Sequence, residues 1–330
     1  MKTIIKPNLY HGKNKKTNFF EGWYFKIVSK DRKDTLAIIP GISMGNSQNN
    51  KHSFIQILDG TNKTFNYCKF PFEDFSYSNN PFSFSIANNI FSLDNLALNI
   101  NTNNTSLFGE LKFSNLYTWQ DSLINPGSMG FYNYLTFMEC YSQVCTLDGD
   151  ISGYLEFNNK KIDFNGGKIY IEKNWGKSFP IEWLWIQNNT FEDNKATITC
   201  SVGEIPFPIC NFRGFLIAAT VDKKFYKFTT INRSKLHLVL NDNSVELTVI
   251  HKDLTLFLKT ETKDSDFILC YGPKNGEMSP YVRETLTGNI YMKLYNNKSN
   301  KLIYEGSGYN SGIEYGGKLM NNRISNYYSY

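Results

Sequence analysis

The sequence predicts an all-β protein, and three observations support this class. Aromatic residues make up 16% of the 330 residues, with 26 Phe and 21 Tyr, and aromatic side chains favour pleated, half-buried strands. No segment keeps a 3.6-residue apolar period over three helical turns. Turn sequences such as NN, DG and NG recur between short apolar segments, as they do in hairpins. We therefore expect short strands joined by tight turns along the whole chain.

The N-terminal half contains the first group of expected strands, each bounded by turn residues. These strands are 22–29, 35–41, 53–60, 107–116, 137–149, 152–175 and 183–189. The clearest hairpin pattern is GYLEF, NNKK and IDFNGGKIYI between residues 153 and 171. Pro126 and Gly127 argue against a long helix in 117–136.

The C-terminal half contains the second group of expected strands, and the whole chain then has too many strands for one simple sheet. These are 196–203, 212–222, 225–232, 235–242, 244–252, 254–262, 267–272, 286–295 and 301–309. Two barrels or sandwiches in tandem would leave few exposed strand edges. We place the domain boundary after the Trp-x-Trp strand, so the predicted domains are 1–190 and 191–330.

Charge and cysteine usage exclude several classes of protein. The formal charge of +5 arises from 35 basic and 30 acidic residues spread along the chain, so the run Lys13–Lys16 is interpreted as a solvated arm and no nucleic-acid partner is expected. Six cysteines without a C-x-x-C pair indicate reduced thiols in a cytoplasmic protein. The chain shows neither an apolar signal-peptide core nor about 18 consecutive apolar residues, so no transmembrane segment is predicted.

Known cofactor motifs are incomplete. The sequence WGKS at 175–178 resembles the end of a phosphate-binding loop, but Ile171 stands where that motif requires glycine. The four histidines lack metal-ligand spacing, so no metal is predicted. The Asn-, Lys- and Ile-rich composition is typical of an AT-rich bacterial genome.

Several expected strands place a large aromatic residue beside a carboxylate or an amide, because alternate strand residues share a face. A buried charge must be paired or neutralised, so such faces are unusual in a plain core. The candidate acids are Glu172, Glu139 and Glu21. The candidate substrate-binding residues are Trp23, Tyr141, Asn174, Trp175, Trp183, Trp185, Gln187 and Asn189. For each residue the alternative is a core aromatic or polar group with a hydrogen-bonded tip, whereas the combined pattern favours a ligand pocket.

Three segments resemble the tocopherol cyclase family. They are FFEGWYFKIVS (19–29), FMECYSQV (137–144) and EKNWGKSFPIEWLWIQNNTF (172–191), with IPGIS, SFIQILDG and the closing GSGYNSGIEYGG in agreement. More distantly, EGWY and NWG…WLW are similar to carotenoid hydratase-type proteins. The resemblance implies two lipocalin-like (calycin-type) β-barrel or sandwich domains packed in tandem.

The resemblance also implies a reaction. Tocopherol cyclases close a chroman ring on a prenylated hydroquinone, which requires protonation of an alkene and capture of the carbocation by a phenol oxygen. A neutral carboxylic acid and aromatic π-faces suffice, without a metal or organic cofactor. The resemblance makes Glu172 the preferred acid, because it stands three residues before Trp175, where the similar hydratase-type proteins carry an acidic residue. The partner would be a hydrophobic small molecule, taken up through peripheral membrane contact. The alternative function is a non-catalytic lipocalin-like carrier.

Overall fold

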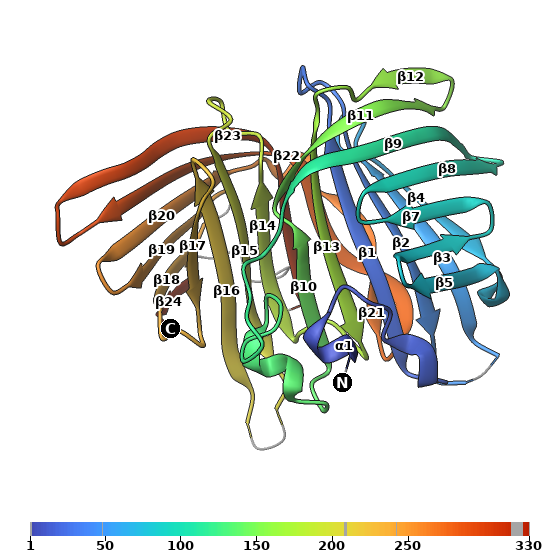
Figure 1. The fold of residues 1–330 in the computed structure, drawn as a ribbon, viewed down its shortest axis with the longest axis horizontal. Helices are drawn as coiled ribbons and strands as arrows, with labels where there is room; N and C mark the ends of the chain where they lie inside the picture. Colours follow the sequence, from blue (N-terminus) through green and yellow to red (C-terminus); the bar gives the residue numbers. More distant parts are fainter. Residues whose placement is uncertain (1, 48, 208–209, 242, 318–325, 330) are drawn as a thin grey trace. The chain divides into compact units, whose positions relative to one another are not determined.

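The computed structural model describes residues 2–47, 49–207, 210–241, 243–317 and 326–329. Strands dominate these residues and form a 13-stranded and an 11-stranded sheet, with antiparallel pairing throughout (Figure 1). The all-β class is therefore confirmed. The chain divides into two compact units: unit 1 comprises Met1–Phe179 with Cys270–Pro280, and unit 2 comprises Pro180–Leu269 with Tyr281–Tyr330.

The 13-stranded sheet belongs to unit 1. Its strands along the main path run in the order β4-β3-β2-β1-β13-β11-β9-β8-β7-β6-β5, while β10 pairs with β13 and β12 with β11. The bounds are β1 Phe19–Val28, β2 Thr35–Met44, β3 Lys51–Asp59, β4 Thr64–Phe70, β5 Phe75–Asn79, β6 Phe82–Ile86, β7 Asn89–Ser92, β8 Asn95–Thr102, β9 Thr105–Tyr117, β10 Cys140–Thr146, β11 Asp148–Phe157, β12 Lys160–Asp163 and β13 Lys168–Gly176.

Only short helices accompany this sheet. They are α1 Lys2–Ile5, η1 Gly12–Asn14, η2 Phe72–Asp74 and η3 Gly130–Tyr134, the last being the only described helix within 117–136. In unit 2, η4 spans Asp264–Asp266. No helix among the described residues is long and apolar enough to cross a membrane.

The sheet of unit 1 curls around its own apolar core. Trp23 on the central strand β1 stacks on Phe84 of the distant strand β6, with ring centres 4.1 Å apart. Strands β3 and β6 also contact each other although many strands separate them along the sheet. Phe19, Trp23, Phe25 and Ile27 of β1, which share one strand face, belong to this core, as the period-2 pattern predicts.

The 11-stranded sheet belongs mainly to unit 2 and follows the order β17-β16-β15-β14-β23-β22-β20-β19-β18-β24, with β21 paired to β22. The bounds are β14 Glu182–Asn188, β15 Ala196–Ile205, β16 Phe212–Val221, β17 Lys224–Thr229, β18 Lys235–Leu240, β19 Val245–His251, β20 Leu254–Glu261, β21 Ile268–Lys274, β22 Glu277–Asn296, β23 Lys301–Gly317 and β24 Asn326–Ser329. Leu184 and Ile186 of β14 face the core of unit 2.

The structure refines the predicted elements at several places. The hairpin predicted at 153–171 is confirmed, because β11 and β12 pair from Tyr154 with Asp163 to Phe157 with Lys160. Residues 64–102 form β4 to β8, although no strand was predicted there. Strand β14, which the sequence placed before the boundary at residue 190, lies in unit 2, and Cys270–Pro280 lies in unit 1. The division at residue 190 therefore differs from these contact-defined units.

Candidate functional site

The predicted site residues occupy three separate surfaces. The core-facing side of β1, β10 and β13 holds Glu21, Trp23, Tyr141 and Trp175. The opposite side of β13 holds Glu172 and Asn174, while Glu139 precedes β10. Unit 2 holds Trp183, Trp185 and Gln187 in β14 and Asn189 directly after it.

A buried ion pair is the centre of the core-facing group. Lys173 Nζ lies 2.6 Å from the Glu21 carboxylate, and both side chains are fully buried. The backbone amides of His11 and Gly12 donate hydrogen bonds of 2.9–3.0 Å to the same carboxylate. Lys173 in turn donates to the carbonyl oxygens of Pro7, at 3.1 Å, and of Leu9. This pair therefore fixes residues 7–12 against the sheet.

The Lys173 ammonium group also lies close to two tryptophan rings. Lys173 Nζ lies 5.0 Å from the ring centre of Trp23 and 4.9 Å from that of Trp175. The rings of His11 and Tyr141 both lie nearly parallel to Trp175, at 4.1 and 5.3 Å. The Lys173 ammonium group therefore lies over the rings of Trp23 and Trp175, which were predicted to stabilise a substrate cation.

The protonation of Glu21 argues against its role as a proton donor. Burial alone would raise the pKa of this carboxyl, but Lys173 and His11 outweigh burial and hold the pKa below its ordinary value. Burial also lowers the pKa of Lys173, an effect that Glu21 opposes. An ionised carboxylate has no proton to give, so this geometry favours the other two candidate acids.

Glu172 lies on the opposite side of β13 and is only 4% exposed. Its carboxylate accepts hydrogen bonds from the Tyr170 hydroxyl at 2.6 Å, the Ser142 hydroxyl at 2.9 Å and the Asn174 amide at 3.3 Å. Hydroxyl groups can donate or accept, so the two hydroxyls can serve a protonated carboxyl as well as a carboxylate. This arrangement suits a group that gives and regains a proton.

Glu139 has a different environment. Its side chain is 35% exposed, and its carboxylate lies 3.5 Å from Lys177 Nζ, itself about half exposed. This carboxylate is therefore open to water and lies beside a surface cation. Of the three candidate acids, Glu172 therefore combines burial with partners for both protonation states.

The outward face of β14 carries the second polar and aromatic group. Leu184 and Ile186 point into the core of unit 2, so Trp183, Trp185 and Gln187 lie on the other face. All three are buried. Neither atom of the fully buried Gln187 carboxamide has a hydrogen-bond partner among the described residues, and such an unsatisfied amide is costly to bury.

Two further carboxylates lie on this face, and neither was predicted as a site residue. Glu314 of β23 pairs with Trp185 across the strands and accepts a hydrogen bond from the Trp183 indole. Glu284 of β22 pairs in turn with Glu314 and is buried. Glu314 stands within the segment GSGYNSGIEYGG, so its position was detectable. Glu284 precedes the predicted strand 286–295 and was not.

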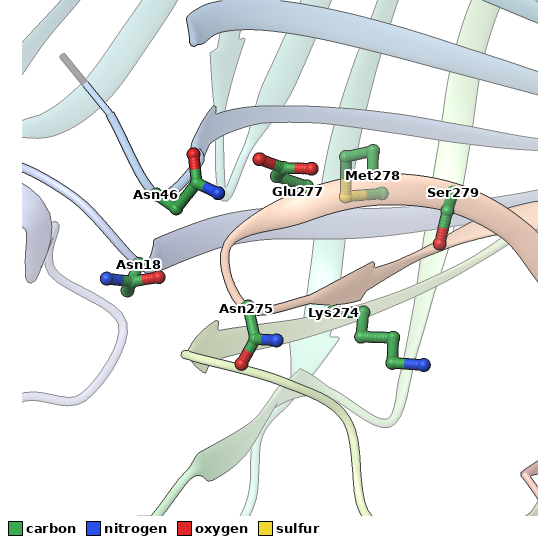
Figure 2. A pocket seen from close by; sticks show the side chains of 7 residues that line it. All are labelled: Asn18, Asn46, Lys274, Asn275, Glu277, Met278 and Ser279. Carbon is green, nitrogen blue, oxygen red and sulfur yellow. The ribbon is translucent and has the colours of Figure 1, made fainter.

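A polar hollow of about 300 Å³ lies elsewhere on unit 1. Figure 2 shows its seven lining residues, which are Asn18, Asn46 and, from the β21–β22 hairpin, Lys274, Asn275, Glu277, Met278 and Ser279. None of the predicted site residues lines it. No group of three His, Cys, Asp or Glu side chains suited to a metal ion occurs within the described parts of the chain.

Comparison with known proteins identifies the family. A sequence profile described as tocopherol cyclase-like matches residues 97–317, which is well over half of the chain. The chain belongs to the tocopherol cyclase-like family. A probable chloroplastic tocopherol cyclase of Oryza sativa subsp. japonica is 23% identical over 211 residues, covering 61% of this chain and 45% of that protein. The chloroplastic tocopherol cyclase of Zea mays is 34% identical over 77 residues, covering 23% and 16%. The chain therefore spans less than half the length of these relatives.

Two solved structures are similar to this chain in fold. The crystal structure of CghA with Sch210972 has a TM-score of 0.54 at 10% identity, with 91% of this chain and 88% of that chain covered. Kievitone hydratase from Nectria haematococca has a TM-score of 0.50 at 12% identity, with 94% and 93% covered. With the two antiparallel sheets, these likenesses confirm the predicted fold of two lipocalin-like β domains in this tocopherol cyclase-like chain.

Proposed function

We propose that this member of the tocopherol cyclase-like family is an enzyme that cyclises or hydrates a prenylated or otherwise unsaturated hydrophobic molecule, with Glu172 as the proton donor. The observation that carries the proposal is the buried Glu172 carboxyl beside two hydroxyl groups, Tyr170 and Ser142. Family membership supplies the reaction class.

The proposed reaction begins with proton transfer from Glu172 to one carbon of a trisubstituted alkene, which leaves a tertiary carbocation on the other carbon. In cyclisation, a phenol oxygen of the same molecule forms a bond to this cation and loses its proton. In hydration, the oxygen of a water molecule forms this bond and loses a proton. The released proton returns to the Glu172 carboxylate, directly or through the Tyr170 or Ser142 hydroxyl, so the cycle consumes no acid.

The outward face of β14 in unit 2, taken by itself, has the chemistry of a surface that binds a partly polar, unsaturated molecule. Indole faces stabilise positive charge, and Trp183 and Trp185 are buried there. The Gln187 carboxamide can both donate and accept a hydrogen bond and uses neither capacity within the described residues. A hydroxyl or phenol on an otherwise apolar molecule would match it. We propose these residues as a surface of unit 2 that binds such a molecule, Asn189 being a weaker candidate because it lies beyond the strand.

The proposal is tested by incubating the purified protein with prenyl hydroquinones and polyenes and analysing the products by mass spectrometry. A cyclised product keeps the substrate mass at a shifted retention time, and a hydrated product gains one water. The variant Glu172→Gln keeps the shape of the side chain but cannot deliver a proton, so we expect turnover to fall by about 10²–10⁴-fold with binding retained. Glu156→Gln, the same change at an exposed position of β11, is the matched control.

Two results would contradict the proposal in different ways. Turnover that survives Glu172→Gln would reject Glu172 as the acid while leaving the enzyme assignment intact. Tight retention of a hydrophobic molecule in native mass spectrometry, with no conversion of any substrate, would instead indicate a carrier.

A further inference from the structure

The connection between β9 and β10, residues 118–139, exposes an unusual amount of apolar surface; we refer to it as the apolar loop. Five of the twelve exposed large hydrophobic side chains among the described residues fall within it. They are Leu123, Ile124, Phe131, Tyr134 and Phe137. Leu123 is 74% exposed and Ile124 is 78% exposed. Contiguous exposed apolar groups of this kind mark interaction surfaces.

Hydrogen bonds give the apolar loop a defined conformation. The Gly127 amide donates to the Asp121 carboxylate at 2.6 Å, and the Tyr134 hydroxyl donates to the Leu123 carbonyl at 2.5 Å. The Ser128 hydroxyl donates to the Ser142 carbonyl of β10 at 2.9 Å, which ties the loop to the sheet. The exposed positions therefore belong to an ordered loop.

The apolar loop also has separate residues for its own packing. Trp119, Met129 and Met138 are all less than a tenth exposed. Because the loop already buries these three large side chains, the exposed group is not required to anchor it. Long connections without regular structure are usually functional.

A basic segment runs beside the apolar loop. Residues 2–18 contain five lysines and no Asp or Glu, and all five lysines are exposed: Lys2, Lys6, Lys13, Lys15 and Lys16. Within the described residues, none of them forms an ion pair. A Cβ built on Gly127 would lie 2.5 Å from Pro7, so the two segments are in direct contact.

The acidic groups of this region are fewer than its lysines. Residues 118–139 contain two acids, Asp121 and Glu139, and Glu139 lies beside another lysine, Lys177, so the five N-terminal lysines leave an excess of positive charge. Exposed apolar side chains next to exposed lysines are the combination that binds anionic membrane surfaces, where the apolar groups enter the headgroup region and the lysines attract phosphate.

We propose that the apolar loop and the N-terminal lysines form a docking surface for an anionic lipid bilayer. The inference rests on exposure and charge alone and is independent of the catalytic role of Glu172.

The test is co-sedimentation of the full chain with phosphatidylcholine vesicles that contain no or about one third phosphatidylglycerol. The loop variant Leu123→Ser/Ile124→Ser/Phe131→Ser is compared with Ile90→Ser/Leu269→Ser/Leu302→Ser, which changes three exposed apolar residues elsewhere. The charge variant Lys13→Gln/Lys15→Gln/Lys16→Gln is compared with Lys235→Gln/Lys252→Gln/Lys298→Gln, which changes three exposed lysines of unit 2.

We expect the wild type to bind anionic vesicles, more weakly at high salt. The loop variant should lose at least tenfold in partitioning to both vesicle types. At about fivefold per lysine, the charge variant should lose on the order of 100-fold on anionic vesicles only. Both control variants should bind like the wild type. Because all changes are at exposed positions, unchanged thermal unfolding will confirm that the variants fold.

Three results would overturn the proposal: a wild type that does not bind anionic vesicles, a folded loop variant that binds as well as the wild type, or control variants that lose as much binding as the test variants. If vesicle binding is absent and the loop variant converts an oligomer to a monomer in sedimentation equilibrium, the apolar loop is instead an interface between copies of this chain.

Discussion

At the scale of single residues, the Glu21–Lys173 pair shows how a catalytic-looking carboxylate can have a structural role. Both groups are removed from solvent, and the N-terminal segment supplies carbonyl and amide partners for them. Removing one member of such a pair leaves a buried charge without its counter-ion.

We therefore predict that Lys173→Met lowers the free energy of unfolding by about 3–5 kcal/mol. The measurement is urea unfolding at neutral pH. Lys177→Met is the control, because its partner Glu139 is partly exposed and exposed pairs contribute about 0–1 kcal/mol. Equal losses for the two variants would mean that the buried pair is no stronger than a surface pair.

His52 provides a second prediction at this scale. It lies buried on β3, with Nε2 2.7 Å from the Tyr67 hydroxyl, and burial together with Lys69 lowers its pKa from 6.5 to about 4. Between these values the unfolded chain binds a proton that the folded chain does not. Stability should therefore fall as the pH is lowered from about 6.5 to 4, by at most about 1.4 kcal/mol per pH unit.

The variant His52→Gln should remove this contribution. Urea unfolding of wild type and variant is compared across pH 4–7, because only the difference isolates His52 from the carboxylates that titrate in the same range. If the difference in unfolding free energy is constant across this range, His52 does not titrate as predicted.

At the scale of elements, β14 combines an inner face that packs into the core of unit 2 with an outer face that carries a buried amide lacking hydrogen-bond partners. Gln187 is fully buried with neither carboxamide atom hydrogen-bonded within the described residues. Violations of this kind are expected at functional sites, where a ligand supplies the missing partner.

We predict that Gln187→Met raises the free energy of unfolding by about 1–3 kcal/mol, because it removes an unsatisfied buried amide. The same change should weaken binding of a hydroxylated hydrophobic ligand, followed by quenching of tryptophan fluorescence. Gln143 is the matched control: it is also buried, but it accepts from the Ser128 amide at 2.9 Å and donates to the Val144 carbonyl at 2.9 Å. Gln143→Met should therefore destabilise. Destabilisation by both variants would contradict the role assigned to Gln187.

At the scale of the whole molecule, the two units are not consecutive in sequence. Residues 270–280 lie in unit 1 although unit 2 residues flank them on both sides. Tyr271 stacks on Tyr67 with ring centres 4.7 Å apart, and the Ser43 hydroxyl donates to the Gly276 carbonyl at 2.8 Å. The Gly276 amide donates to the Lys177 carbonyl at 2.7 Å.

A fragment of residues 1–190 should therefore be less stable than the same fragment with residues 270–280 fused through a flexible linker. One aromatic stack and two hydrogen bonds correspond to about 3 kcal/mol, measured by urea unfolding. A fusion with a scrambled 270–280 sequence is the control. If the native and scrambled fusions unfold at the same urea concentration, these residues do not complete unit 1.

Local sequence determined that the chain forms strands and which residues share one face of a strand. Alternation is a property of neighbouring residues, so Glu21 with Trp23, and Trp185 with Gln187, could be placed on shared faces before any partner strand was known. The strands in 64–102 were missed because their alternating residues are largely Phe with Ser or Asn, and the Asn-rich stretches were interpreted as turns.

Only the tertiary structure decided which of these residues meet. Glu21 meets Lys173 and His11, Trp183 meets Glu314, and Tyr67 meets Tyr271. Except for His11, these partners lie more than a hundred positions away along the chain. Strand pairing brings such partners together, and neither alternation nor turn chemistry encodes which distant strand will pair. The ionisation of Glu21, which argues against Glu21 as the acid, depends on those distant partners and not on the local pattern that it shares with Glu172.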